Sequence, residues 1–182
     1  METKNNRMRS TGMVAIVAAS LLAGCAVPFP VYTVSSSNVT SIRSAKAVVE
    51  LGEFSGLQTS VSCRLQPISP EGNRTFAQYI RGALNDEVVI AGPSSSVRKS
   101  KLSLQLKNID VDCAVGAASW MMEVDVSING KPSFNVKTVR NFDGNFMGNV
   151  VAQRAYQAFV PSVQQLIADI MMHPNFKAEF GS

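Results

Sequence analysis

Apolar and polar side chains alternate along most of the chain between residues 102 and 136, which restricts this stretch to a sheet with one buried face. The apolar positions are Leu102, Leu104, Leu106, Ile109, Val111, Cys113, Val115, Trp120, Met122, Val124, Val126, Phe134 and Val136. The alternation slips by one residue near Lys107-Asn108, where a β-bulge would keep both sets of side chains on the core face. We therefore expect three strands, the last two forming an antiparallel hairpin.

The hairpin connection contains Asn129-Gly130, a pair typical of tight turns. A two-residue turn would place Val124 opposite Asn135 and break the apolar face. A three-residue loop that begins at Ile128 instead pairs Val124 with Phe134. We predict the three-residue loop, with Gly130 in a left-handed conformation.

Two stretches have helical periodicity. The first follows residues 69–73 and ends at Gly92-Pro93, with Phe76, Ile80, Ala83 and Leu84 on one face. The second runs from about Val150 to His173, and its apolar stripe consists of Val151, Ala155, Phe159, Val163, Leu166, Ile167, Ile170 and Met171. Pro161 predicts either a kink or a fresh helix start there, because proline inside a helix costs about 3 kcal/mol.

Two extended segments precede the first helix. Ala45–Phe54 is apolar and β-branched, and Val61, Cys63 and Leu65 alternate with polar neighbours. At 182 residues the chain has room for one ordinary domain behind a targeting segment. The sequence predicts one α+β domain over residues 44–182, of order β(β)-α-β-β-β-α, in which an antiparallel sheet carries two main helices on one face.

The N-terminus has the order of a secretory signal. Lys4, Arg7 and Arg9 precede an apolar stretch, residues 12–22, that is shorter than the roughly 20 residues needed to span a bilayer. An ordinary secretory signal would share these features. The stretch ends in Leu21-Leu22-Ala23-Gly24-Cys25, which resembles the lipobox of bacterial lipoproteins. The resemblance implies a signal peptide over residues 1–24 and acyl chains, palmitate among them, on Cys25.

The same resemblance predicts where the mature chain is held. Several acyl chains anchor stably, because each buried methylene contributes about 0.8 kcal/mol. Ala26 stands where an aspartate would favour inner-membrane retention in enterobacterial-type sorting, so we expect the outer membrane, with the domain facing the periplasm. Pro28, Pro30 and a run of serines predict a flexible tether over residues 25–43, able to reach about 60 Å if extended.

Cys63 and Cys113 are the remaining cysteines. In an exported chain, oxidising conditions let disulfides persist, so we predict that the two pair. The alternative is two buried free thiols. A zinc site is disfavoured, because His173 is the only histidine and four nitrogen or sulfur ligands are normally required.

The sequence offers no recognisable catalytic set. Ser96-Val97-Arg98-Lys99 matches S-x-x-K but falls in a loop without the partner motifs of penicillin-binding enzymes, so we interpret it as a solvated loop. His173 falls in the last turn of the second helix, where an imidazolium would favour the helix dipole. We predict no cofactor.

Four carboxylates share the outward face of two predicted strands: Asp110, Asp112, Glu123 and Asp125. Together they form a weak candidate site for a divalent cation. A solvated acidic face, partly neutralised by a neighbouring Lys137, is the favoured interpretation.

Net charge argues against nucleic acid as a partner. The first 24 residues carry a net +2 of the chain's formal +4, so the mature chain carries only about +2, too little for a clustered phosphate-binding face.

The order of strands and helices behind the lipobox resembles the small YajG-like outer-membrane lipoproteins and, more loosely, the LptE-like and PqiC-like accessory lipoproteins. Three stretches carry the resemblance: 79–92 leading into 102–112, the hairpin at 128–131, and 165–180. The cysteine pair and the proline in the last helix depart from the YajG-like pattern. The resemblance implies no enzyme activity, which favours a non-enzymatic binding or scaffold subunit that holds an envelope protein. The alternative is an enzyme or lipid carrier that acts on envelope lipid or peptidoglycan, at the acidic face or in a pocket under the last helix.

Overall fold

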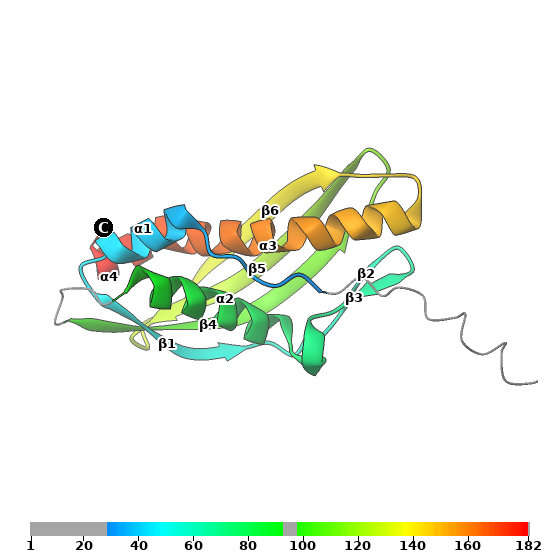
Figure 1. Ribbon diagram of the computed structural model, residues 1–182. Coiled ribbons are helices and arrows are strands. Elements are labelled where there is room, and N and C mark those ends of the chain that lie inside the picture. The colour runs from blue at the N-terminus through cyan, green and yellow to red at the C-terminus, as the bar shows by residue number, and fades with distance from the viewer. Residues whose placement is uncertain (1–28, 93–97, 182) are drawn as a thin grey trace, which may run out of the picture.

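The α+β fold predicted from the sequence is confirmed by a computed structural model that describes residues 29–92 and 98–181 (Figure 1). A four-stranded sheet has the order β1-β4-β5-β6, and a separate hairpin pairs β2 with β3. The strands are β1 (Val48–Ser55), β2 (Val61–Cys63), β3 (Gln66–Ile68), β4 (Lys99–Asp112), β5 (Ala117–Ile128) and β6 (Phe134–Asp143). The helices are α1 (Ser36–Ser44), α2 (Phe76–Ala91), α3 (Gly148–Met172) and α4 (Pro174–Phe180), with a 3-10 turn η1 (Glu71–Asn73) before α2.

The sheet is antiparallel except at one edge, where β1 pairs parallel with β4. The sequence predicted an antiparallel sheet but did not predict this parallel edge. The reason is the position of α2 between β1 and β4 in the chain: a helical crossover returns the backbone to its original direction, as parallel pairing requires.

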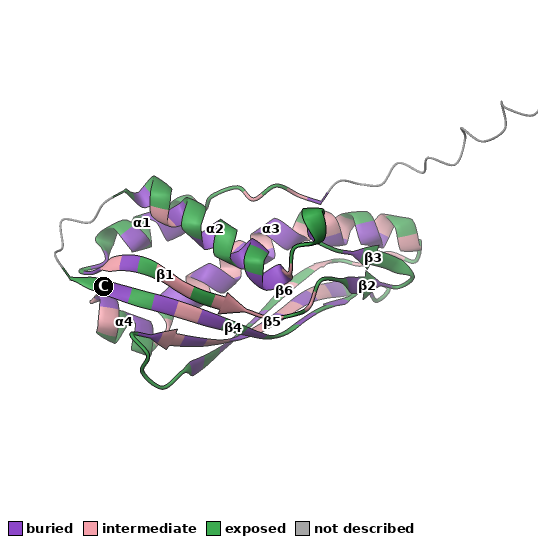
Figure 2. Ribbon diagram, turned by 90° about the horizontal axis from the view of Figure 1, so that it is seen from below, coloured by how far each residue is buried: buried purple, intermediate pink, exposed green. Residues whose placement is uncertain are grey.

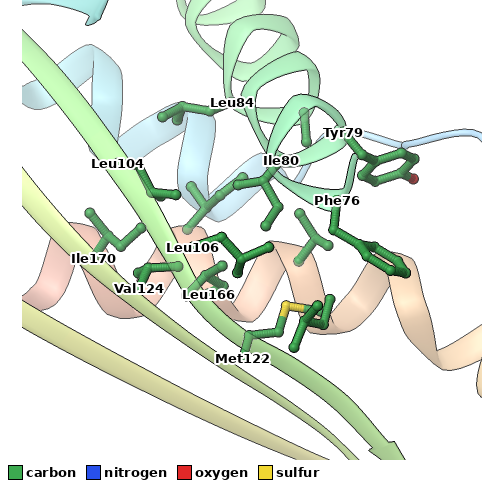
Figure 3. Packing of buried hydrophobic residues seen from close by; sticks show 14 of the residues in the cluster. Phe76, Tyr79, Ile80, Leu84, Leu104, Leu106, Met122, Val124, Leu166 and Ile170 are labelled. Carbon is green, nitrogen blue, oxygen red and sulfur yellow. The ribbon is translucent and has the colours of Figure 1, made fainter. Parts of the chain in front are cut away.

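The helices lie on one face of the sheet (Figures 1 and 2). α2 packs on β1 and β4, and α3 packs on β5 and β6. Figure 3 shows the result: apolar side chains of α2, such as Ile80, meet those of β4, such as Leu106, and those of α3, such as Leu166. The opposite face of the sheet is not covered by any element within the described residues.

The alternation in β4 and β5 places the side chains as predicted. A register shift between Leu106 and Asn108 is the expected bulge, and it keeps Leu106 and Ile109 on the buried face. Two residues at the ends of the predicted pattern differ. Leu65 and Val115 lie in turns, where their side chains are 96% and 69% exposed.

The β5–β6 hairpin keeps the predicted face but not the predicted register. Val124 pairs with Val136 instead of Phe134. Asn129 and Gly130 both have positive φ, and Lys131 N–H donates to Ile128 O, as in a two-residue I′ turn. Pro132 cannot donate to the ladder, and an offset of one residue on the β6 side restores the phase that this tight turn alone would break.

α2 and α3 have the predicted apolar faces. Thr75 and Gln78 form a capping box at the start of α2, and Gly92 ends it with φ 77°. The predicted stripe of α3 is buried throughout. The helix continues through Pro161, which excludes the second of the two predicted outcomes, a fresh start. Ser162 Oγ donates to Ala158 O at 2.7 Å on the turn that the proline interrupts. No helix among the described residues is long and apolar enough to cross a membrane.

Residues 29–44, which we call the strap, correct the prediction of a flexible tether over 25–43. The strap packs on the domain: Phe29 is 7% exposed, and Val39 and Ile42 of α1 are buried. Just beyond it, Lys46 N–H donates to Phe180 O at 2.6 Å, which joins the start of the described chain to its end. The other residues of the predicted tether, 25–28, lie outside the described residues, and so does the predicted signal peptide.

Candidate functional site

The first described residue, Phe29, is held in an aromatic cluster. Its ring centroid lies 4.8 Å from that of Phe159, 5.3 Å from that of Tyr79 and 6.0 Å from that of Tyr156. Tyr79 Oη donates to Pro30 O at 2.9 Å. The chain is therefore fixed to the domain only four residues after Cys25.

A buried carboxyl group holds the middle of the strap. Glu87 of α2 is fully buried, and its Oε1 accepts hydrogen bonds from Tyr32 Oη, from Ser35 N at 3.2 Å and from Asn38 Nδ2 at 3.1 Å. Asn38 Nδ2 also donates to Gln164 O of α3 at 3.0 Å. These bonds fasten the strap to both main helices.

The environment of Glu87 favours its neutral form. Burial raises the pKa of this carboxyl, and the three donors oppose the shift without cancelling it. Glu87 Oε2 has no hydrogen-bond partner among the described residues. The sequence does contain a signal for this group: Glu87 falls on the apolar face of α2, three residues after Leu84, where an unpaired charge would be costly.

Glu87→Gln should change how stability depends on pH. A raised native pKa means that the folded state binds more protons than the unfolded state above about pH 4.3, so the wild type loses stability as pH rises through this range. Glutamine cannot ionise and keeps an oxygen acceptor for the three donors. Urea unfolding should therefore show a variant whose stability gains on that of the wild type as pH rises above about 4.3. A constant difference between the two proteins would contradict this assignment.

The space under α3, the helix predicted to be the last and the place where the enzyme or carrier alternative puts its site, is closed. The apolar void between α1, α2, α3 and the sheet measures about 10 Å³, roughly the space of one water molecule. It is lined by Ile42, Val49, Leu84, Leu102, Ile167, Ile170, Met171 and Phe176. A second cavity, of about 160 Å³, lies between the strap and α2, and it is smaller than the roughly 300 Å³ of a small-molecule pocket.

The predicted acidic face is spread along the open side of the sheet. In the β4–β5 register Asp110 faces Met121 and Asp112 faces Ser119, while Glu123 faces Asn108. Asp110, Asp112 and the pair Glu123 and Asp125 therefore occupy successive positions along the hairpin. No three His, Cys, Asp or Glu residues in the described part of the chain are grouped so that they could hold a metal ion.

Glu123 and Asp125 are joined by an amide. Asn135 Nδ2 donates to Glu123 Oε1 at 3.2 Å and to Asp125 Oδ1 at 2.9 Å. Lys107 Nζ lies 3.8 Å from Asp125 Oδ2, and Lys137 is the register partner of Glu123 on β6. Two lysines therefore lie beside this pair of carboxylates.

Next to this pair the open face is hollowed. A shallow depression of about 450 Å³ crosses β1, β4 and β5. It is lined by Glu53, Ser55, Ser103, Leu104, Gln105, Asp125, Ser127, Lys131 and Ser133. Its floor is rich in hydroxyl and amide groups, which can bond to the backbone or side chains of another molecule.

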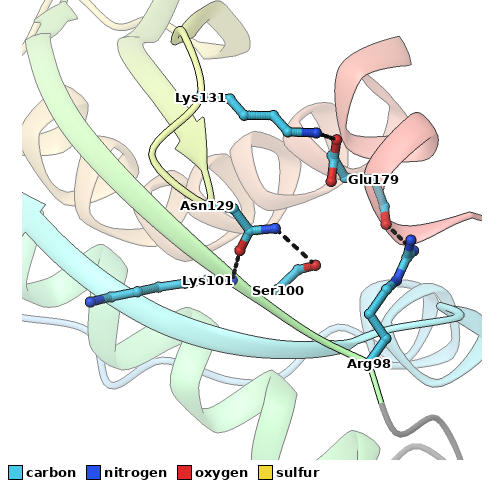
Figure 4. Close-up of polar contacts among 6 residues, drawn as sticks. All are labelled: Arg98, Ser100, Lys101, Asn129, Lys131 and Glu179. Carbon is cyan, nitrogen blue, oxygen red and sulfur yellow. Dashed lines mark hydrogen bonds and ion pairs between the residues drawn. The ribbon is translucent and has the colours of Figure 1, made fainter.

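The end of the open face near α4 is fastened by polar contacts (Figure 4). Asn129 Oδ1 accepts from Lys101 N at 2.8 Å, and Asn129 Nδ2 donates to Ser100 Oγ at 3.3 Å. The Glu179 side chain pairs with Lys131, and its carbonyl accepts from Arg98. The hairpin turn and α4 are thus held together beside the depression.

The remaining predicted residues have structural roles. His173 Nδ1 accepts from Asn175 N at 3.2 Å, and its ring stacks on Phe134 at 4.2 Å. His173 therefore ends α3, as predicted, and also caps the start of α4. In the S-x-x-K match, Ser96 and Val97 lie outside the described residues, and Lys99 pairs with Glu50 at 2.8 Å.

Cys63 and Cys113 form a disulfide, as the sequence predicted, with a Cα–Cα distance of 5.5 Å. The bond joins the β2–β3 hairpin to the end of β4, and Arg64, next to Cys63, donates to Cys113 O at 3.1 Å.

No protein-family model matches the sequence, and a search of curated proteins finds no match. Solved structures give distant similarities. A presumed lipoprotein from Caulobacter crescentus CB15 is 13% identical with a TM-score of 0.46, over 79% of this chain and 98% of its own. A protein of the DUF330 family from Xanthomonas campestris is 12% identical with a TM-score of 0.41, over 73% of this chain and 85% of its own. At these values neither structure assigns a family or a function to this chain.

Proposed function

We propose that this chain is a lipoprotein of the bacterial envelope, anchored to the outer membrane through acyl chains on Cys25. Its domain faces the periplasm and binds another envelope protein as a non-enzymatic subunit. The anchor rests on the lipobox-like sequence that ends at Cys25 and on the charged-then-apolar segment before it.

The observation that supports the binding role is the open face of the sheet. The helices bury one face, whereas the other presents the depression described above, lined by Ser55, Ser103 and Ser127. A shallow polar surface of this kind suits a protein partner, because protein interfaces are about as polar as the rest of the surface and are formed by broad contacts. A lipid carrier would need an enclosed apolar cavity, and the void under α3 holds about 10 Å³.

Site-specific photo-crosslinking in intact cells tests the binding face. A photoreactive residue at Ser103 or Ser127 should give a discrete protein adduct, and the same residue at Gln157, exposed on α3, should not. Ser127→Arg should reduce crosslinking from Ser103 at least tenfold, in line with the roughly 2 kcal/mol lost when an interface centre is disrupted. Gln157→Arg is the matched control.

Cys25→Ala tests the anchor. The variant should fold, as judged by the fluorescence of the buried Trp120, but should leave the membrane fraction. An outer-membrane location that survives Cys25→Ala would refute the anchor.

The crosslinking experiment has its own contrary outcome. Adducts with glycan or lipid at Ser103 and Ser127, in place of protein, would refute the proposed partner and favour the carrier or enzyme alternative.

A further inference from the structure

Four large apolar side chains are exposed together at one end of the molecule, and we call them the tip surface. Leu65, in the β2–β3 turn, is 96% exposed, and Val115, in the β4–β5 turn, is 69% exposed. Phe146 and Met147, in the β6–α3 loop, are 72% and 46% exposed. Isolated exposed apolar residues are ordinary, but four on neighbouring loops leave a patch of apolar surface in contact with water, which is typical of an interaction site.

The three loops are held against one another. The Cys63–Cys113 disulfide links the first loop to the second. Arg64 links the first to the third, because its guanidinium donates to Asn145 O at 2.8 Å and to Phe146 O. Gly144 N–H donates to Gly116 O at 3.0 Å, and a Cβ at Gly144 would collide with Ala114 O, which joins the second loop to the third. The four apolar side chains are therefore held on three loops that are bonded to one another.

The first of these turns contains a residue in the left-handed conformation. Cys63 pairs with Gln66, so Arg64 and Leu65 alone form the turn, and Arg64 has φ 55°. Positions of this kind favour glycine or asparagine. Here an arginine takes the left-handed position and a leucine stands at the apex.

The described chain begins in the half of the molecule that carries the tip surface, away from α4 (Figure 1). Phe29 packs on Tyr156, whose hydroxyl donates to Pro67 O at 3.2 Å, two residues from Leu65. Cys25 precedes Phe29 by four residues, a span of at most about 14 Å. An acylated Cys25 therefore holds this end of the domain, and not the end that carries α4, close to the bilayer.

We propose that the tip surface docks on the lipid bilayer, with Leu65, Val115, Phe146 and Met147 in the interfacial layer of the leaflet that holds the acyl chains of Cys25. This inference rests on the lipid anchor of the proposed function. The short connection to Phe29 selects lipid over protein as the occupant, because the bilayer is the one surface that the anchor places within reach. The domain would then contact the bilayer with its tip surface, and the open face of the sheet would extend away from the membrane into the periplasm.

Tryptophan quenching by brominated lipid tests the docking. The mature, acylated protein is reconstituted into phosphatidylcholine vesicles with brominated acyl chains, carrying either Leu65→Trp or, as control, Ile90→Trp. Ile90 is 55% exposed and lies about 21 Å along α2 from Phe76, at the other end of the molecule. The native Trp120 is fully buried and adds the same background to both.

We expect the added fluorescence of Leu65→Trp to be quenched at least about twofold and to shift to the blue on vesicle binding, as tryptophan does in the interfacial layer. Ile90→Trp should change little. Equal quenching of the two variants in protein that floats with the vesicles would overturn the docking and leave the anchor intact. Failure of the wild type to acquire acyl chains and float would overturn both proposals.

Discussion

Phe159→Ala is expected to lower the free energy of unfolding by about 3 to 5 kcal/mol, the range for removing a fully buried phenylalanine side chain. Phe159 is 0% exposed, and its ring lies 4.9 Å from Trp120 of β5 and 5.1 Å from Tyr79 of α2. It also packs on Phe29 of the strap at 4.8 Å. Alanine would therefore remove packing contacts with the sheet, with α2 and with the strap at once.

Urea unfolding followed by circular dichroism measures this loss. Phe146→Ala is the matched control, because Phe146 is 72% exposed and its truncation should change stability by about 0.5 kcal/mol or less. A loss below about 1 kcal/mol for Phe159→Ala would mean that the aromatic cluster is not packed as described.

Removing the disulfide should have an effect of similar size. The bond closes a chain segment with a sequence separation of 50 residues, for which restriction of the unfolded chain predicts about 4 kcal/mol, within the usual range of about 2 to 4. The double substitution Cys63→Ser and Cys113→Ser should lower stability by about this amount and make the tip loops easier to cleave.

Reductant provides the control for the disulfide. It should destabilise the wild type to the level of the double serine variant and have no effect on the variant itself. A wild type whose urea midpoint is unchanged by reductant would show that the two cysteines are present as free thiols, the alternative that the sequence left open.

The parts of the fold that the sequence predicted are those encoded locally. Alternation placed Trp120 and Val124 on the buried face, and helical spacing placed Phe159 and Leu166 in the stripe of α3. The bulge at Lys107 could be predicted because a change of phase within one strand has only one simple structural solution.

The parts that were missed depend on contacts between distant segments. Phe29 and Tyr32 stand among prolines and serines, so nothing nearby shows that they pack on α2 and α3. The partners of Glu87 lie 49 to 55 residues away, and the sequence marks only the acidic residue on an apolar helix face. The parallel pairing of β1 with β4 likewise depends on the path of the intervening helix.

The joining of the two ends of the described chain bears on the order of folding. Phe29 packs on Phe159, and Lys46 bonds to Phe180, so the core is incomplete until α3 and α4 are available. Contacts between residues so far apart in sequence form late, because a long loop must close first. A chain that emerges N-terminus first, from a ribosome or from a translocation channel, would therefore complete this core only after α3 and α4 have emerged.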